Sequence, residues 1–152
     1  MNDCNERLVS RFPVVVRRRV AWGECDPAGV VYTPRFADYV VLARDWFTRS
    51  ALGFVDRPHP SRQAITYPTK ALAFEFASFL AADDVFDMTV EIAGVTRRTF
   101  TTRITARHVE RSGIAFLATL TSVCVDQALG TAIELPGDVR SGLKRYQEQT
   151  AR

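Results

Sequence analysis

Residues 20–47 constrain the fold more than any other part of the chain, because they combine a strand end, a tight turn and the start of a long apolar helix. The turn holds one acid, Asp26, directly before the P-A-G tripeptide that must bend the backbone. Thr33 is a good helix N-cap, and Pro34 suits the first helical position because its missing N–H costs nothing there. Gly53 supplies a helix stop. We therefore expect a helix over residues 34–52.

The apolar residues of this predicted helix follow helical spacing and spread beyond one face. The main stripe consists of Phe36, Tyr39, Val40, Ala43, Trp46 and Phe47. Further apolar residues widen the surface that this stripe presents. A helix that is apolar over most of its circumference is usually wrapped by other structure rather than laid on it. The sequence therefore predicts a central, enclosed helix.

The pattern after residue 64 changes to period two, which is typical of strands. It predicts strands at residues 65–79, 85–95, 100–109 and 114–125, in addition to one at 14–22 before the helix, and a last helix at 137–149. We expect four strands in a meander. One antiparallel sheet curled around the long helix would bury both apolar surfaces, which makes the fold class α+β. Residues 1–12 read as a polar N-terminal lead-in, and residues 13–150 as a single domain.

Composition excludes several classes of protein. The chain has 152 residues, 47% hydrophobic and 24% charged, which is an ordinary globular balance for one domain. A net charge of +3 is too small to argue for nucleic-acid binding. The three scattered cysteines favour a reducing cytoplasm over a disulfide scaffold or a zinc site. No stretch resembles a signal peptide or a membrane span, so we expect no membrane partner and a cytoplasmic protein.

The sequence G-E-C-D-P-A-G-V-V-Y, followed by an apolar helix, resembles the 4-hydroxybenzoyl-CoA thioesterase branch of the hot-dog-fold acyl-CoA thioesterases. The resemblance continues more weakly to about residue 136. It implies a hot-dog fold, an acyl-CoA substrate and no metal or redox cofactor. It also implies a homodimer or homotetramer, since one sheet leaves an exposed edge that a second copy can pair.

The resemblance makes Asp26 the catalytic carboxylate. From the residues alone, Asp26 could instead be an Asx-turn acid that only bonds its own backbone. Unpaired N–H groups at a helix start favour negative charge and can stabilise an oxyanion. We therefore expect the backbone N–H of Thr33 to hold the thioester carbonyl, although relatives often carry Tyr or His at this position. Asp26 would attack that carbonyl or activate a water.

Five residues are candidates for substrate binding. Those of the turn and helix start are Gly29, Val30, Tyr32 and Phe36; Thr69 corresponds to a position at which relatives line the site from the partner subunit. Core packing explains Phe36 equally well, and a strand threonine needs no function. The helix offers no polar side chain at 40–42 to hold a ring hydroxyl, so 4-hydroxybenzoyl specificity does not transfer.

Arg97 and Arg98 are candidates for binding the nucleotide phosphates of coenzyme A, because relatives use basic residues in this region and guanidinium groups pair well with phosphate. A solvated pair at a strand end is the alternative interpretation. The run from Arg17 to Arg19 fits alternating strand charges better than a binding patch.

Other nucleophiles and ligands have weaker support. Cys25 fits a small buried apolar residue better than a nucleophile, since no histidine is near it in sequence. His59 and His108 are the only histidines, and each fits a surface position better than a triad or metal site. A non-catalytic module that binds acyl-CoA or an acyl carrier remains the alternative to an acyl-CoA thioesterase.

Overall fold

The computed structural model describes residues 5–53 and 65–151. Its main layer is a six-stranded sheet in the order β1-β2-β5-β6-β7-β4, and every neighbouring pair is antiparallel. These strands are β1 (Glu6–Arg11), β2 (Val14–Arg19), β4 (Thr69–Phe76), β5 (Val85–Val95), β6 (Thr99–His108) and β7 (Ile114–Val123). A small second sheet, in the order β3-β8-β9, consists of β3 (Ile65–Thr66), β8 (Val125–Asp126) and β9 (Thr131–Ala132).

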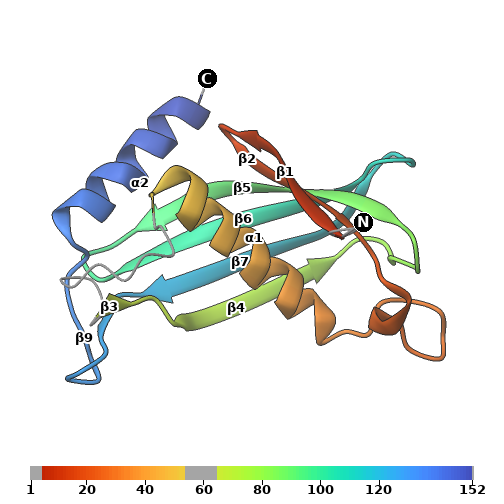
Figure 1. The fold of residues 1–152 in the computed structure, drawn as a ribbon, viewed down its shortest axis with the longest axis horizontal. Coiled ribbons are helices and arrows are strands. Elements are labelled where there is room, and N and C mark those ends of the chain that lie inside the picture. Colours follow the sequence, from red (N-terminus) through yellow and green to blue (C-terminus); the bar gives the residue numbers. More distant parts are fainter. Residues whose placement is uncertain (1–4, 54–64, 152) are drawn as a thin grey trace.

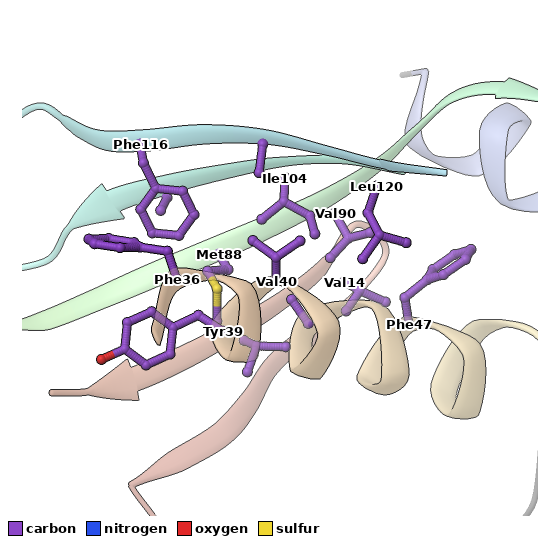
Figure 2. Packing of buried hydrophobic residues seen from close by; sticks show 14 of the residues in the cluster. Val14, Phe36, Tyr39, Val40, Phe47, Met88, Val90, Ile104, Phe116 and Leu120 are labelled. Atoms are coloured by element: carbon purple, nitrogen blue, oxygen red, sulfur yellow. The ribbon is translucent and has the colours of Figure 1, made fainter. Parts of the chain in front are cut away.

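The long helix α1 (Arg35–Ala51) crosses one face of the sheet (Figure 1). Helix and sheet bury their apolar residues against each other (Figure 2). The fully buried side chains of this layer include Tyr39, Val40, Phe47, Met88, Val90, Ile104 and Leu120. One antiparallel sheet with a long helix packed across its face confirms the predicted α+β class, and the alternating burial along β5 explains how a period-two sequence builds it.

Both ends of α1 lie close to their predicted positions. The helix begins one residue later than expected, with Pro34 at the N-cap and no side chain capping it. The predicted capping role of Thr33 is therefore wrong, although the Thr33 carbonyl accepts a hydrogen bond from Phe36 at 3.2 Å. Gly53 has φ +67°, the left-handed conformation that ends helices and that glycine adopts without strain.

The N-terminal residues differ from the prediction. Residues 1–12 were expected to form a polar lead-in, but Glu6–Arg11 form strand β1, which pairs antiparallel with β2. The strand lies at the edge of the sheet and its residues alternate between half-buried and exposed. Leu8 and Val9 are the only apolar residues of this short strand, and its low apolar content is why the sequence pattern missed it.

The predicted four-strand meander is also wrong. β5, β6 and β7 follow one another in the sheet, but β4 pairs with β7 and not with β5. β4 therefore forms the second edge of the sheet, and seven of its eight residues are exposed. A bulge interrupts the pairing of β5 with β6, since the register shifts between Ile92 and Gly94.

The last helix, α2 (Gly137–Thr150), agrees with the predicted C-terminal helix. It packs against β5 and against the C-terminal end of α1, where the rings of Tyr146 and Phe47 lie 4.8 Å apart. The Tyr146 hydroxyl donates to the Val90 carbonyl at 2.6 Å and accepts from the Val14 N–H at 2.8 Å. Burial raises the pKa of Tyr146 to about 12, so the hydroxyl keeps its proton and both bonds.

Candidate active site

Asp26 lies in a tight turn that closes on itself. Its backbone N–H donates to the Val30 carbonyl at 2.9 Å, and its carbonyl accepts from Gly29 at 2.9 Å. Gly29 has φ +82°, so the turn requires a glycine at this position. The Asp26 Oδ1 atom accepts a hydrogen bond from the Ala28 N–H at 2.8 Å. This is the predicted Asx-turn contact, and it leaves Oδ2 without a donor among the described residues.

Backbone contacts join this turn to neighbouring segments. Cys25 and Val31 form a β-bridge across the base of the turn, and Val31 donates to the Leu80 carbonyl at 2.8 Å. The Tyr32 N–H donates to the Glu24 carbonyl at 2.9 Å. These backbone hydrogen bonds hold residues 24–32 as a loop next to the segment that follows β4.

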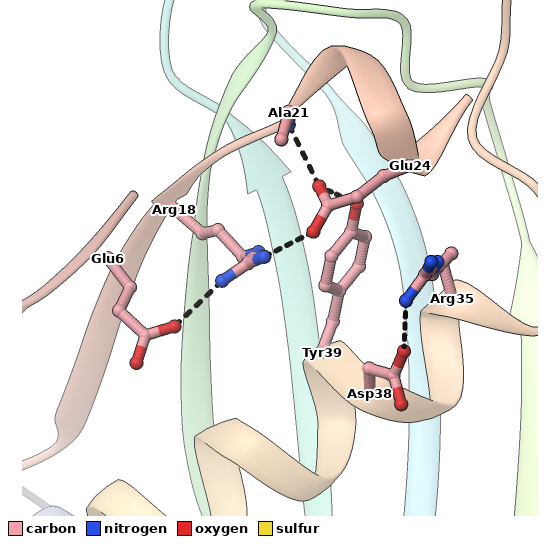
Figure 3. Close-up of polar contacts among 7 residues, drawn as sticks. All are labelled: Glu6, Arg18, Ala21, Glu24, Arg35, Asp38 and Tyr39. Carbon is pink, nitrogen blue, oxygen red and sulfur yellow. Dashed lines mark hydrogen bonds and ion pairs between the residues drawn. The ribbon is translucent and has the colours of Figure 1, made fainter. Parts of the chain in front are cut away.

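The Glu24 side chain anchors the same loop to the helix and the sheet (Figure 3). Its carboxylate accepts hydrogen bonds from the Ala21 N–H at 2.8 Å and from the Tyr39 hydroxyl at 2.7 Å. It also pairs with Arg18, which in turn pairs with Glu6 at 2.7 Å. Burial opposes the charge of Glu24, but these donors outweigh it and lower its pKa below the ordinary value.

The Glu24 network was not predicted from the sequence. A signal was present, since Arg18 falls on the same strand face as Val16 and Val20, which are fully buried. A charged residue on a core-facing stripe needs an acid nearby, because an unpaired charge is costly to bury. Glu24 is the acid nearest to Arg18 in the sequence.

The start of α1 offers an unpaired donor. Arg35 donates to the Tyr32 carbonyl at 2.8 Å and Phe36 to the Thr33 carbonyl, so the chain turns before the helix proper. Among the described residues, the backbone N–H of Thr33 has no acceptor. Helix starts carry such free N–H groups together with the positive end of the helix dipole.

A cavity of about 280 Å³ lies beside this donor. Its wall is apolar, apart from Thr33 and Ser78, and consists of Val30, Val31, Thr33, Phe36, Phe76, Ala77, Ser78, Phe79 and Leu80. Asp26 and Tyr32 are not part of this wall; Tyr32 is 54% exposed. The turn meets the cavity through Val30, whose carbonyl holds the Asp26 N–H.

Thr69, Arg97 and Arg98, which were predicted to be site residues, lie at the end of the sheet opposite the cavity. Phe36 lies at the end of the sheet that holds the cavity, because its ring lies 4.8 Å from the ring of Phe76 and both residues line the cavity wall. Thr69 begins the same strand that Phe76 ends, and it pairs with Ser122. Arg97 and Arg98 are exposed and directly precede β6, whose first residue pairs with Val123, the neighbour of Ser122. One protomer therefore does not bring these three residues to the cavity.

Arg97 already has an acidic partner. Its guanidinium pairs with Glu134, and its carbonyl accepts from Leu135 at 3.0 Å and from the Arg140 side chain at 3.0 Å. The Arg97 side chain is still 73% exposed, so it remains accessible to an anion that displaces Glu134. Surface pairs of this kind are weak and exchange readily.

The remaining candidate nucleophiles and ligands are placed as follows. Burial, followed by the nearby carboxylates of Glu24 and Asp26, raises the pKa of Cys25 and disfavours the thiolate that a nucleophile requires. His59 lies outside the described residues. His108 is partly exposed at the end of β6, in keeping with the expected surface position, and it is bonded to Ser78. Within residues 5–53 and 65–151, no three Asp, Glu, His or Cys side chains gather as a metal site, and no helix could span a membrane.

Fold, turn and cavity together define a hot-dog protein with an acid-bearing turn at the start of its central helix. Comparison with family models identifies residues 20–143 as thioesterase-like superfamily sequence. The chain belongs to this superfamily, and its enzyme class is thioester hydrolase. The family and hot-dog fold expected from the sequence are thereby confirmed.

Solved structures give the same fold. A 1,4-dihydroxy-2-naphthoyl-CoA thioesterase from Synechocystis matches with a TM-score of 0.75 at 18% identity, covering 86% of this chain and 94% of that one. A gentisyl-coenzyme A thioesterase matches with a TM-score of 0.74 at 20% identity, covering 85% and 98%. A Staphylococcus aureus protein in complex with CoA matches with a TM-score of 0.80 at 15% identity, covering 98% and 89%. The comparison with curated proteins gave no match.

Proposed function

We propose that this protein is an acyl-CoA thioesterase that hydrolyses a small or aryl acyl-CoA to the free acid and CoA. One observation carries the proposal: Thr33, whose N–H has no acceptor among the described residues, lines an apolar cavity that the Asp26 turn adjoins. An apolar acyl group fits such a cavity, and its thioester carbonyl can then accept the Thr33 N–H. The solved relatives named for naphthoyl-CoA and gentisyl-CoA substrates support an aryl group.

Asp26 and Thr33 divide the chemistry between them. Negative charge develops on the thioester oxygen when the carbonyl carbon is attacked, and the Thr33 N–H at the positive end of α1 stabilises it. The Asp26 carboxylate has Oδ2 free to act. It either attacks the carbon, releasing CoA thiolate and leaving an anhydride that water cleaves, or removes a proton from an attacking water. Neither route uses a metal or a redox cofactor, and we propose that the enzyme needs none.

The proposal includes a dimer formed along β4. This edge strand leaves its backbone unpaired on one side and exposes Leu72 and Phe76 by 37% and 50%. Two β4 strands paired antiparallel would place the Thr69 end of one protomer beside the Phe76 end of the other. Thr69, Arg97 and Arg98 of one chain would then approach the cavity of its partner. Pairs of such dimers would give the tetramer.

CoA would enter from the surface of this dimer. Its phosphates would contact Arg97 and Arg98, whose guanidinium groups suit phosphate oxygens. Gly29, Val30, Tyr32 and Phe36 would contact the acyl group and the pantetheine from one chain, and Thr69 from the other. The CoA bound to the Staphylococcus aureus relative supports this ligand class. The scattered cysteines favour a cytoplasmic location.

Thiol release from aryl, short and long acyl-CoAs tests the proposal, with wild type beside Asp26→Asn. The change keeps size but removes charge and basicity, so we expect a loss of several hundredfold, or about 4 kcal/mol of transition-state stabilisation. Asp38→Asn is the matched control, because Asp38 is exposed on α1 and pairs with Arg35. It should keep wild-type rates. Equal rates for Asp26→Asn and wild type would contradict the proposal.

A binding module is the second candidate, and the Ala28–Asp26 contact favours it, because an Asx turn alone explains an aspartate here. The two candidates separate in the same assay. A module binds the acyl-CoA in calorimetry but releases no thiol, and Asp26→Asn does not change its affinity.

A further inference from the structure

Ser78 closes one side of the cavity with a polar group that the proposed mechanism does not use. It follows β4 and, with Thr33, is one of two wall residues that carry a polar side chain. Thr33 belongs to the helix start, where the thioester carbonyl is proposed to bind. Ser78 is therefore the polar side chain left for the rest of the acyl group.

Two hydrogen bonds fix the Ser78 hydroxyl. Its Oγ lies 2.9 Å from the Ile114 carbonyl and 2.7 Å from His108 Nε2. A carbonyl only accepts, so the single hydroxyl proton points to Ile114. Oγ must then accept from His108, which places the imidazole proton on Nε2.

The other ring nitrogen supports the same assignment. Arg111 Nε donates to His108 Nδ1 at 3.2 Å, which requires an unprotonated Nδ1. Burial, together with the charge of Arg111, lowers the pKa of His108 and favours this neutral form. The histidine is thus a donor to Ser78 and an acceptor from Arg111.

Arg111 is itself held in place. Its Nη2 donates to Asp84 Oδ2 and to the Phe79 carbonyl, each at 2.9 Å, and its guanidinium carbon lies 5.1 Å from the centre of the Phe79 ring. Asp84 Oδ2 also accepts from the Ala81 N–H at 2.8 Å. Asp84, Arg111 and His108 therefore brace the wall segment that contains Ser78 and Phe79.

This arrangement does not activate Ser78 as a nucleophile. A general base must accept the serine proton, but His108 Nε2 carries a proton and Arg111 occupies Nδ1. A hydroxyl has one donor and two acceptor positions. With its proton on Ile114 and one lone pair on His108, Ser78 keeps one lone pair as an acceptor.

We propose that Ser78 determines acyl specificity by accepting a hydrogen bond from a hydroxyl group on an otherwise apolar acyl group. The proposal rests on the proposed thioesterase function and assigns the substrate class of the same cavity. The aromatic side chains of Phe36, Phe76 and Phe79 receive the apolar body of the acyl group. The Ser78 hydroxyl, which His108 holds in one orientation, accepts a hydrogen bond from a hydroxyl on the acyl group. An unsubstituted acyl group leaves the Ser78 lone pair without a donor.

The experiment compares benzoyl-CoA with its 2-, 3- and 4-hydroxy derivatives. For wild type we expect one hydroxy isomer to be preferred over benzoyl-CoA in kcat/KM, and Ser78→Ala to reduce that preference about fivefold, the size of one neutral hydrogen bond. Ser112→Ala, in an exposed turn outside the cavity wall, should keep the wild-type preference. Calorimetry with the corresponding thioethers, which cannot be hydrolysed, measures the same preference as affinity.

Variants of His108 test whether this residue orients the Ser78 hydroxyl. His108→Gln can donate to Ser78 and accept from Arg111, so it should retain the preference, whereas His108→Ala should lose part of it. A separate outcome is a wild type that hydrolyses none of the thioesters and still binds the hydroxylated thioether more tightly than the unsubstituted one. If Ser78→Ala then removes that difference in affinity, the thioesterase proposal is contradicted and the specificity role of Ser78 is supported. A wild type without preference in rate and affinity, or a Ser78→Ala variant that keeps the preference, would overturn the inference.

Discussion

The Tyr39 hydroxyl, on α1, donates a hydrogen bond to the carboxylate of Glu24 at 2.7 Å. Glu24 lies two positions before Asp26 in the chain. Tyr39 is fully buried, and the Arg18 guanidinium lies 4.9 Å from the centre of its ring. A part-buried hydrogen bond therefore joins the central helix to the turn that carries the proposed catalytic acid. This contact should position Asp26 as well as stabilise the fold.

Removal of the Tyr39 hydroxyl tests this coupling. Tyr39→Phe keeps the ring packing but deprives Glu24 of a donor, and hydrogen bonds to charged groups contribute about 1.5–3 kcal/mol. We expect a loss of about 2 kcal/mol in the free energy of unfolding, measured with urea. Tyr32→Phe is the control, since Tyr32 is 54% exposed, and it should leave stability unchanged. Equal unfolding midpoints for all three proteins would remove Tyr39 from this role.

The lowered pKa of Glu24 predicts an acid-sensitive stability. A carboxyl whose pKa is lower in the folded than in the unfolded state stabilises the protein above its ordinary pKa of 4.5. That contribution is lost as pH falls from this value through the folded-state pKa. Glu24→Gln should be less stable than wild type at pH 7, and the difference should shrink as pH falls below 4.5. Urea midpoints measured across this range check it; a constant difference would contradict the assignment.

The sequence predicted the elements whose signal is local. The strand at 85–95 has the bounds that alternation gave, because apolar and polar residues alternate over residues 86–92 within it. The long helix and the glycine that ends it were equally clear. Strand β1 was missed because Leu8 and Val9 stand among polar residues at a sheet edge.

Contacts between distant segments were beyond the sequence pattern. Nothing in the alternation of β4 says that it pairs with β7, so consecutive pairing was the natural and wrong choice. The Asp26 turn could be found because its parts are adjacent in the chain. Ser78, His108 and Arg111 meet only because β4, β6 and the β6–β7 turn end at the same corner of the sheet.

Gly29 should be required for activity as well as for the turn. With φ +82°, an added Cβ meets no atom within 4 Å, so Gly29→Ala costs backbone strain of about 1–2 kcal/mol rather than a clash. We expect the turn to shift, and thiol release to fall with Asp26 displaced. Gly23→Ala is the matched control because it also meets no atom and has no positive φ. A Gly29→Ala enzyme with wild-type kcat would show that the turn does not position Asp26.

Charge on the β4 edge should prevent the proposed dimer. Leu72 lies in the middle of β4 and is 37% exposed, so Leu72→Glu would place two carboxylates close together when two edges pair. We expect sedimentation to give a dimer or tetramer for wild type and a monomer for the variant. Leu129→Glu, at a position that is 72% exposed and outside β4, should leave the assembly intact. Because Thr69 and the arginines would come from the partner, the monomer should also lose thiol release; an active monomer would place the complete site within one chain.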